Sequence, residues 1–290
     1  MKSSENCERL RSDVLRFAES QLKEAGSEEP HQLAEELWLL AAGCTRTQFL
    51  LKKEDLTSEV RNRFELFLSR ALKGEPLAYI EGVAPFYGFE FEVNPHVLVP
   101  RADSECLIDL ALEITQGTNS GRCIDFGTGS GCLLLSFLSH RPKWKGVGVD
   151  ICDKALAVAE RNSNNLGLTG QCDWLNESWD TELNLQPIEL LIANPPYVFP
   201  GEELGFGVQE HEPALALFTP PDNPMNPYQH LLQRAKELLS LNGNLLFEVG
   251  AGRTSEVRTL CEEVGFVVRE VRKDLGGIER VIYASRPASI

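Results

Sequence analysis

The chain has 290 residues, of which 42% are hydrophobic, and a formal net charge of −15. This length accommodates one large domain or two of ordinary size, and the hydrophobic content suffices for a core, which excludes a disordered protein. The negative charge repels a phosphate backbone at long range and no dense Lys/Arg cluster offsets it, so we expect no direct binding to nucleic acid.

The eight cysteines are scattered, and no two of them form a C-x-x-C pair. Neither a zinc ribbon nor a redox motif is therefore predicted, and the five histidines show no metal-ligand spacing either. Several cysteines lie in apolar segments, where a free thiol behaves as a small hydrophobe, which favours a reducing compartment. The first residues lack the apolar core of a secretory signal, and no run reaches the roughly 18 apolar residues of a membrane span. We expect a cytoplasmic protein with no membrane segment and no metal.

The first part of the chain has the apolar periodicity of helices. Apolar residues recur every three or four positions over residues 10–22 and 60–71. Between them lies "LAEELWLLAAG", which ends at Gly43, a typical helix stop. The pattern predicts a small helical domain over residues 1–76.

From Tyr79 the period changes to two. Phe89, Phe91 and Val93 alternate with acidic residues in "GFEFEVN", which Gly88 and a proline bound. We predict a β-hairpin connector over residues 77–102.

Strands and helices alternate over residues 103–290. Strands are predicted at 122–126, 145–150, 188–194, 243–250, 266–271 and 280–285, and helices at 132–140, 153–167, 228–240 and 254–265. Such alternation, with strands rich in Val, Ile and Leu, indicates an α/β domain whose parallel sheet is covered on both faces. No helix separates the final two strands, so the last one is expected to pair antiparallel.

A glycine-rich loop, "DFGTGSGC", joins the first of these strands to its helix. It does not fit the dinucleotide fingerprint G-x-G-x-x-G/A, because Cys132 occupies the third slot, and it lacks a P-loop lysine. Glycines spaced G-x-G-x-G after an acidic residue are typical of the nucleoside-binding loop of S-adenosylmethionine (AdoMet) methyltransferases. The alternative is a tight turn with an incidental acid.

The AdoMet interpretation requires a second carboxylate at the end of the next strand to hold the ribose hydroxyls, and Asp150 is in that place. Asp125 would lie near the ammonium group of the ligand. The predicted contacts of the loop are Asp125, Gly127, Thr128, Gly129, Ser130 and Gly131.

The adenine side of the predicted site is left open by the sequence. Asp173 and Trp174 could supply a polar edge contact and a stacking face, or they could be a surface acid beside a core tryptophan.

The tetrapeptide Asn194-Pro195-Pro196-Tyr197 follows a predicted strand, at the edge of the sheet that carries the other site residues. The Asn194 side-chain oxygen and the constrained Pro195 carbonyl offer two acceptors for a planar –NH2 group, and Tyr197 offers a face for stacking. Pro195 and Pro196 stiffen the segment and remove competing donors. We predict Asn194, Pro195 and Tyr197 as catalytic and all four residues as substrate-binding. By itself the tetrapeptide allows adenine or glutamine as the acceptor, and a plain strand terminator is the remaining alternative.

Taken together, these segments resemble the HemK/PrmC protein-glutamine methyltransferases over nearly the whole chain. The resemblance includes "GEPLAYIEG", "FYGFEFEV", "VLVPRADSE", "DFGTGSG", "IANPPYV", "EHEPALAL" and "KDLGGIERVIYA". It implies a seven-stranded, Rossmann-like AdoMet-dependent methyltransferase domain over residues 103–290, preceded by a small helical domain.

The resemblance also implies an activity, a co-substrate and a partner. The activity is methylation, with AdoMet, of the side-chain amide nitrogen (N5) of the glutamine in the Gly-Gly-Gln loop of class I peptide chain release factors. Residues 127–131, Asp150, Trp174 and Asn194 would contact AdoMet, residues 194–197 would hold the glutamine, and the helical domain would help dock the release factor.

The chain departs from the family pattern in several places. "PRADSE" at residues 100–105 replaces P-R-P-x-T-E, the segment before Asp173 is short, and "FTPPDNPMNP" at 218–227 replaces a glycine-rich run. We expect the 218–227 loop near the rim of the active site, and His211 and Glu212 at the surface.

Two other functions are alternatives to this one. An N6-adenine methyltransferase of DNA or RNA faces the same chemistry but predicts a basic groove, which a net charge of −15 disfavours. A non-catalytic AdoMet-binding protein predicts loss of Asn194 or of the glycine loop, and both are intact.

Overall fold

The computed structural model describes residues 2–51, 57–185 and 187–288, with side chains from residue 11 onward. The chain divides into two compact units, which are described separately. The smaller unit consists of Met1–Gly82 and Glu203–His211, and the larger of Val83–Glu202 and Glu212–Ile290. Residues 1 and 52–56 of the predicted helical domain lie outside the described residues.

The smaller unit is helical. Its helices are α1 (Lys2–Ala25), α2 (Pro30–Ala42), α3 (Arg46–Leu50), α4 (Ser58–Ala71), α5 (Leu77–Glu81) and α9 (Val208–His211). Gly43 ends α2 in the left-handed conformation, as expected for a glycine after the last helical residue. The core is built around Trp38 and Phe64, whose ring centroids lie 5.2 Å apart in an edge-to-face arrangement.

Segment 203–211 belongs to this helical unit although it follows the predicted active-site tetrapeptide in the chain. The His211 imidazole lies 2.9 Å from the Lys73 carbonyl oxygen. The backbone of Gly207 lies so close to Gly74 that a β-carbon on Gly207 would be 1.9 Å from the Gly74 oxygen. Phe206 packs beside Gly74. No pattern in the sequence predicted this association.

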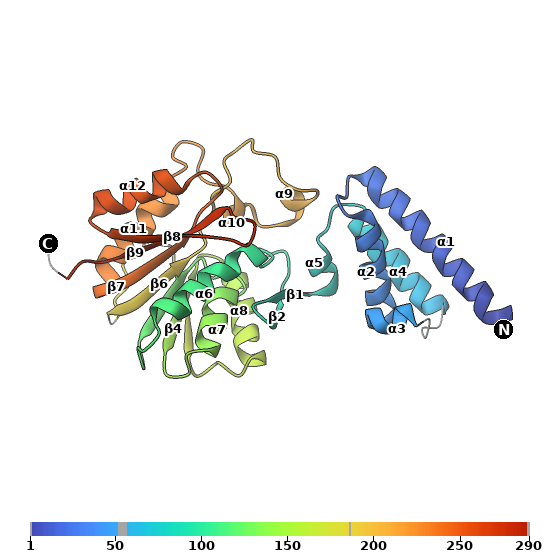
Figure 1. Ribbon diagram of the computed structural model, residues 1–290, viewed down its shortest axis with the longest axis horizontal. Coiled ribbons are helices and arrows are strands. Elements are labelled where there is room, and N and C mark those ends of the chain that lie inside the picture. Colours follow the sequence, from blue (N-terminus) through green and yellow to red (C-terminus); the bar gives the residue numbers. More distant parts are fainter. Residues whose placement is uncertain (1, 52–56, 186, 289–290) are drawn as a thin grey trace. The chain divides into compact units, whose positions relative to one another are not determined.

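The larger unit contains a two-stranded hairpin and a seven-stranded sheet (Figure 1). The hairpin consists of β1 (Val83–Phe86) and β2 (Phe89–Glu92), and the sheet of β3 (Arg122–Phe126), β4 (Lys145–Asp150), β5 (Cys172–Asn176), β6 (Ile188–Ala193), β7 (Leu239–Glu248), β8 (Val267–Lys273) and β9 (Glu279–Ser285). The strand order is β5-β4-β3-β6-β7-β9-β8, and the first five strands are parallel. β9 runs antiparallel to both β7 and β8, which confirms the expectation for the last strand.

Helices cover both faces of the sheet, because strand residues alternate between two cores. The unit contains a 3-10 turn, η1 (Ala102–Ser104), and helices α6 (Glu105–Ile114), α7 (Cys132–Ser139), α8 (Asp153–Asn165), α10 (Ala214–Leu217), α11 (Asn226–Leu238) and α12 (Thr254–Val264). Leu190 and Ile192 of β6 pack against α6 and α7, and Leu191 and Ala193 pack against α11 and α12. The structure confirms the predicted Rossmann-like α/β sheet preceded by helices.

Several elements differ from the sequence-based expectation. Residues 77–81 form α5 instead of the start of a hairpin, and the hairpin is confined to residues 83–92. Neither α6 nor β5 was predicted. β7 begins at Leu239, inside the segment predicted to finish a helix, because pairing of Leu239 with Ile188 of β6 overrides the local helical pattern.

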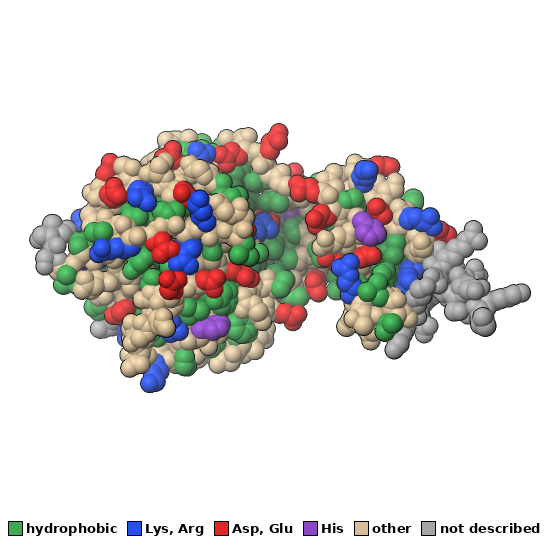
Figure 2. Space-filling view, viewed as in Figure 1, with side chains coloured by type: hydrophobic (Ala, Val, Ile, Leu, Met, Phe, Trp, Pro, Cys, Tyr) green, Lys and Arg blue, Asp and Glu red, His purple; other side chains and the backbone are tan. Residues whose placement is uncertain are grey.

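Acidic and basic side chains are intermixed on the face of the molecule shown in Figure 2. Of the helices built from the described residues, none combines the length and the apolar character that a bilayer crossing requires.

Candidate functional site

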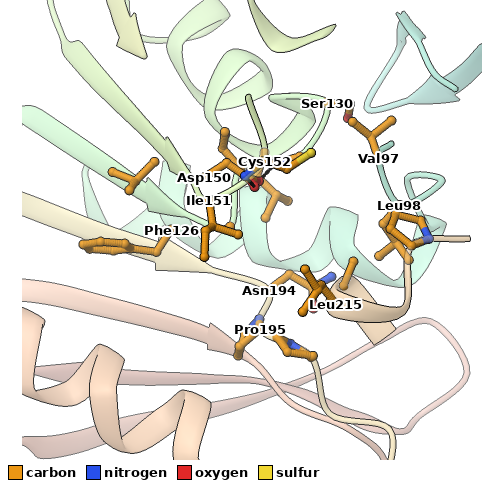
Figure 3. A pocket seen from close by; sticks show the side chains of 18 of the residues that line it. Val97, Leu98, Phe126, Ser130, Asp150, Ile151, Cys152, Asn194, Pro195 and Leu215 are labelled. Carbon is orange, nitrogen blue, oxygen red and sulfur yellow. Dashed lines mark hydrogen bonds between the residues drawn. The ribbon is translucent and has the colours of Figure 1, made fainter. Parts of the chain in front are cut away.

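A cavity of about 460 Å³ lies in the larger unit, where the carboxyl ends of the parallel strands meet (Figure 3). In an open parallel sheet this is where ligands bind. The cavity is lined by residues 95–98, 100–101, 104, 126–130, 132–133, 149–152, 177–180, 194–196, 213 and 215–216.

The glycine loop forms one wall of the cavity, between β3 and α7. Gly127, Gly129 and Gly131 have φ angles of 72°, 54° and 79°, a conformation that favours glycine. The Gly127 and Thr128 amides donate to the Val149 carbonyl at 2.8 and 3.1 Å, which ties the loop to the end of β4. Of the predicted loop contacts, residues 127–130 line the cavity, whereas Asp125 and Gly131 are not among the lining residues.

Asp150 ends β4 and faces the cavity. One carboxylate oxygen accepts from the Gly129 amide and the other from the Cys152 amide, both at 2.9 Å. Burial raises the pKa of Asp150, and these backbone hydrogen bonds oppose the shift. Each oxygen keeps a further lone pair, so the fixed carboxylate can accept from the two adjacent hydroxyls of a ribose.

Asp125 lies behind the loop rather than at its surface. Its side chain is fully buried and accepts a hydrogen bond of 2.7 Å from the Thr128 hydroxyl, while Thr128 itself lines the cavity. Burial raises the pKa of Asp125 to about 7. A contact of Asp125 with an ammonium group remains a prediction.

The tetrapeptide forms the opposite wall. Asn194 follows β6 and lines the cavity together with Pro195 and Pro196. The Asn194 amide nitrogen lies 3.4 Å from the Ser104 hydroxyl oxygen, a residue 90 positions away in the chain. In Figure 3, Asn194 and Pro195 lie across the cavity from Asp150 and Cys152.

Tyr197 is not among the residues that line the cavity. Its ring packs on Gly250, where an added β-carbon would lie 3.0 Å from Tyr197 Cδ2, and its hydroxyl lies 3.5 Å from Glu248 Oε1. Burial, with the nearby Glu248 carboxylate, raises the pKa of Tyr197 to about 12. The stacking role predicted for Tyr197 remains a prediction.

Asp173 and Trp174 lie within β5 and are not among the cavity-lining residues. The Trp174 indole packs over two glycines: β-carbons on Gly148 and Gly131 would lie 2.3 and 3.1 Å from it. Asp173 is exposed. This arrangement agrees with the alternative in which Trp174 belongs to the core beside a surface acid.

The residues directly after β5 line the cavity, whereas Trp174 does not. β5 continues to Asn176, and Glu177, Ser178, Trp179 and Asp180 line the cavity. The sequence analysis missed them because it predicted no strand over residues 172–176. The rule that found Asp150 and Asn194, that ligands gather just after strands, would have identified them once β5 was recognised.

Glu212 binds residues in a third part of the cavity wall, near Pro100 and Arg101. Its side chain is buried, which corrects the surface placement expected from the sequence. It accepts from the Val99 amide at 3.1 Å and from the Arg101 guanidinium at 2.5 Å. Pro100 and Arg101 line the cavity on one side of this contact and Pro213 on the other. Glu212 therefore joins two distant segments of the wall.

The proline-rich loop does not itself line the cavity, and its position near the rim of the active site remains a prediction. None of residues 218–227, all of which the structure describes, lines the cavity. Thr219 instead pairs with Val198 through its amide at 2.9 Å, and Pro227 opens α11. The nearby lining residue is Leu215 of α10, which is exposed and was not predicted.

The donor set of the cavity suits a nucleoside with a free ribose diol. Backbone groups of residues 127–130 and the Asp150 carboxylate occupy one side, and an aromatic side chain, Trp179, lies among the residues after β5. Among the described side chains, no group of three or more His, Cys, Asp or Glu residues could hold a metal ion.

Two family models match the chain. The PrmC N-terminal domain matches residues 13–82, and the methyltransferase small domain matches residues 104–207.

Curated relatives match over most of the chain. The release factor glutamine methyltransferase of Caulobacter vibrioides is 33% identical over 91% of this chain and 92% of its own length. The bifunctional methyltransferase of Rickettsia typhi is 30% identical over 94% of this chain, and the chain spans 56% of that relative's length. Among solved structures, a ribosomal protein L11 methylase from Lactobacillus delbrueckii subsp. bulgaricus has a TM-score of 0.50 at 16% identity, covering 67% of this chain and 84% of its own, which concerns the fold alone.

Proposed function

The chain belongs to the family of release factor glutamine methyltransferases, and we propose that it transfers the methyl group of AdoMet to the side-chain amide nitrogen of a glutamine. The acceptor is the glutamine of the Gly-Gly-Gln loop of a class I peptide chain release factor. One observation carries the proposal: the glycine loop, Asp150 and the Asn194-Pro195-Pro196 segment line a single cavity.

AdoMet binds along the wall formed by the glycine loop. The loop backbone at residues 127–130 approaches the ligand without side chains at Gly127 and Gly129, and Asp150 accepts from the ribose hydroxyls. Trp179 flanks the adenine, in place of Trp174.

The acceptor amide binds on the opposite wall. An amide nitrogen is a poor nucleophile because its lone pair is delocalised. The Asn194 side-chain oxygen and the Pro195 carbonyl accept from its two hydrogens, which orients the nitrogen and raises its electron density as N–H acidity develops.

The transfer is a single displacement. The nitrogen lone pair forms the new N–C bond while the C–S bond of the sulfonium breaks, and that electron pair stays on sulfur as a neutral thioether. The nitrogen then releases one proton to water. The products are S-adenosylhomocysteine and N5-methylglutamine.

The helical unit is the part of the chain that docks the release factor. It matches the PrmC N-terminal domain, a module separate from the methyltransferase domain, so it is available for a contact outside the cavity. We propose a cytoplasmic location, since the proposed substrate is a translation factor.

The test uses the purified full-length protein, AdoMet with a labelled methyl group, and a class I release factor. A second sample contains the same factor with the loop Gln changed to Ala. We expect label on the first factor only, at the glutamine side chain by mass spectrometry. Equal labelling of both factors, no labelling of either, or transfer to adenine in a parallel DNA or RNA sample would overturn the proposal.

A further inference from the structure

Glu248 is a buried carboxyl next to the proposed methyl-transfer site. It ends β7, and the pairing of Ala193 with Phe247 places Glu248 beside Asn194 at the ends of two adjacent parallel strands. Residues in register on neighbouring strands point to the same face of the sheet. The Glu248 side chain therefore lies beneath the tetrapeptide and is 1% exposed.

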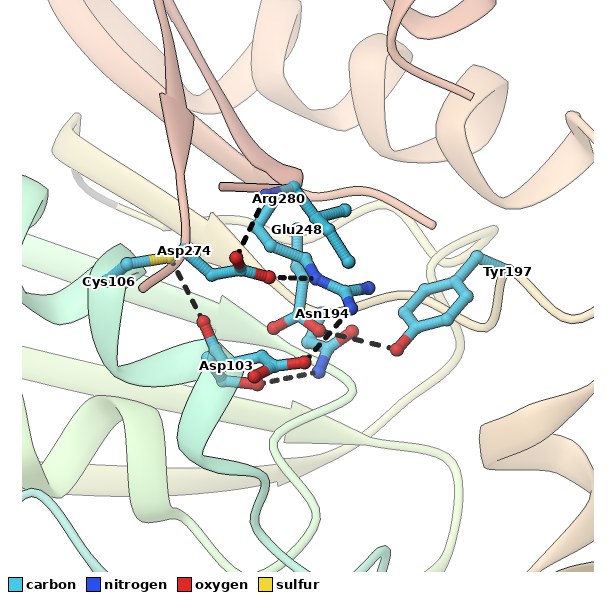
Figure 4. Close-up of polar contacts among 9 residues, drawn as sticks. Asp103, Cys106, Asn194, Tyr197, Glu248, Asp274 and Arg280 are labelled. Atoms are coloured by element: carbon cyan, nitrogen blue, oxygen red, sulfur yellow. Dashed lines mark hydrogen bonds and ion pairs between the residues drawn. The ribbon is translucent and has the colours of Figure 1, made fainter. Parts of the chain in front are cut away.

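Glu248 faces groups at both ends of the tetrapeptide (Figure 4). At one end, Oε1 lies 3.5 Å from the Tyr197 hydroxyl. At the other end, the Ser104 hydroxyl lowers the pKa of the Glu248 carboxyl, and its oxygen lies 3.4 Å from the Asn194 amide nitrogen. Within the described part of the chain, Oε2 has no hydrogen-bond partner by distance and angle, which is unusual for a buried carboxyl oxygen.

Among the described side chains, none forms an ion pair with Glu248. The Arg280 guanidinium is the nearby cation, and it is held by Asp274 at 2.8 Å and by Asp103 at 2.9 Å. Burial raises the pKa of Glu248 to about 7, and Ser104 and Arg280 oppose that shift. The titratable and charged groups that face it from the packed elements are Arg280, Asp103, Tyr197, Tyr228, Cys106 and Cys132.

We propose that Glu248 is a positioning residue for methyl transfer: the Ser104 hydroxyl donates a hydrogen bond to Glu248, and this bond fixes which end of the Asn194 amide faces the cavity. The inference rests on the proposed function, since it concerns the acceptor that holds the substrate amide. Glu248 does not touch substrate.

Hydrogen-bond chemistry decides which group donates and which accepts in each contact between Glu248, Ser104 and Asn194. An ionised carboxylate only accepts, so the Ser104 proton points toward Glu248 and the Ser104 oxygen accepts from the Asn194 –NH2 group. The Asn194 oxygen is then left to accept from the glutamine amide. A protonated Glu248 donates to Ser104 instead, and the Ser104 proton turns toward Asn194. The amide then flips and presents donors to a substrate group that is itself a donor.

Transfer therefore requires the ionised form of Glu248. Ionisation occurs as the pH rises through the pKa, so the single-turnover rate should rise with pH up to about 7 and level off above it. The Glu248→Gln variant should lose this dependence, because its side chain does not titrate. Its rate at pH 8 should fall about 10- to 100-fold, the usual effect of removing a group that orients a reacting one. AdoMet affinity, measured by calorimetry, should stay within about twofold.

A second variant separates orientation from a general structural defect. Ser104→Ala should lower the rate and also flatten the pH profile, because it removes the hydroxyl through which ionisation of Glu248 reaches the Asn194 amide. A purely structural loss would lower the rate equally at every pH. The matched control is Glu279→Gln, the same exchange at an exposed position of β9, which should keep the wild-type profile.

The outcomes separate the two proposals. If the wild-type enzyme labels the release factor and Glu248→Gln has the wild-type rate and profile, the role of Glu248 is wrong and the proposed function stands. If the wild-type enzyme labels no release factor, the proposed function is wrong. The positioning role is then judged without substrate, by carbon-13 NMR of the Glu248 carboxyl and nitrogen-15 NMR of the Asn194 side chain. Both signals should titrate together near pH 7, and an Asn194 signal that is insensitive to Glu248 ionisation would overturn the inference.

Discussion

Single residues that are close in sequence can lie in different positions relative to the cavity. Asn194 and Pro195 line the cavity, whereas Tyr197 packs on Gly250 beside Glu248. The tetrapeptide thus has a ligand-facing part and an anchored part, and substitutions in the two parts should have different effects.

Removing the Asn194 acceptor should affect transfer more than binding. We expect Asn194→Ala to lower the single-turnover rate on the order of 100- to 1000-fold, the effect of deleting one hydrogen-bonding group that acts on the transition state. AdoMet should still bind, with reduced affinity. The control is Asn165→Ala, at an exposed position near the end of α8, which should leave the rate within about twofold. An Asn194→Ala rate within a few-fold of wild type would contradict the role of the amide.

The two tryptophans around the end of β5 should behave differently on substitution. Trp179→Ala should weaken AdoMet binding by about 1–3 kcal/mol, the usual worth of stacking on a base, with a smaller effect on stability. Trp174→Ala should lower the free energy of unfolding by about 3–5 kcal/mol, because it removes an aromatic side chain packed over Gly148. Calorimetry and urea unfolding of both variants provide the comparison. A loss of affinity confined to Trp174→Ala would restore the original assignment.

At the scale of elements, hydrogen bonds join the end of β4 to the glycine loop. The amides of Gly127 and Thr128 bind the Val149 carbonyl, and Asp150 binds the Gly129 amide. Trp174 of β5 fills the space left by Gly148 and Gly131 beneath the loop. The loop conformation therefore depends on close packing between strands as well as on its own glycines.

A methyl group at Gly148 should disturb this packing. Its β-carbon would lie 2.3 Å from Trp174 Cζ3, so Gly148→Ala should lower the free energy of unfolding by about 1–3 kcal/mol and weaken AdoMet binding. Gly170→Ala is the matched control, since Gly170 has open space and no positive φ. Urea unfolding that gives the same stability for both variants would show that β4 tolerates the added carbon.

At the scale of the whole molecule, the chain leaves the methyltransferase unit after Glu202 and returns to it at Glu212. Between these points it supplies residues 203–211 to the helical unit. Val198 pairs with Phe218, so the base of this excursion is closed by backbone bonds. The helical unit is therefore completed by a segment that is connected, through only a few residues, to the tetrapeptide proposed as catalytic.

Gly207→Ala should destabilise the helical unit. The added carbon would lie 1.9 Å from the Gly74 oxygen, and the φ of Gly207 is 76°. Gly201 has a φ of 93° and open space, so Gly201→Ala bears the backbone strain without the clash. We expect hydrogen exchange in α4 to be faster in Gly207→Ala than in Gly201→Ala, together with a higher KM for the release factor. Equal exchange in the two variants would mean that the Gly74–Gly207 approach contributes nothing to stability.

The sequence by itself determined the α/β sheet, the glycine loop, Asp150 and the tetrapeptide at the strand ends, because each depends on local periodicity or spacing. The bounds of β3 and β4 agree with their predicted ranges. The local pattern did not reveal β5, so the sequence could not show that Trp179 lines the cavity while Trp174 packs over Gly148; both facts depend on how β5 pairs with β4.

The residues around Asn194 could not be predicted from the sequence either. Ser104 and Glu248 lie far from it in the chain. Glu248 comes beside it because β6 pairs with β7, and Ser104 contacts it because η1 precedes a helix on the same face of the sheet. Contacts of this kind are set by strand order and by the alternation of side chains between faces, and neither is encoded by any short segment.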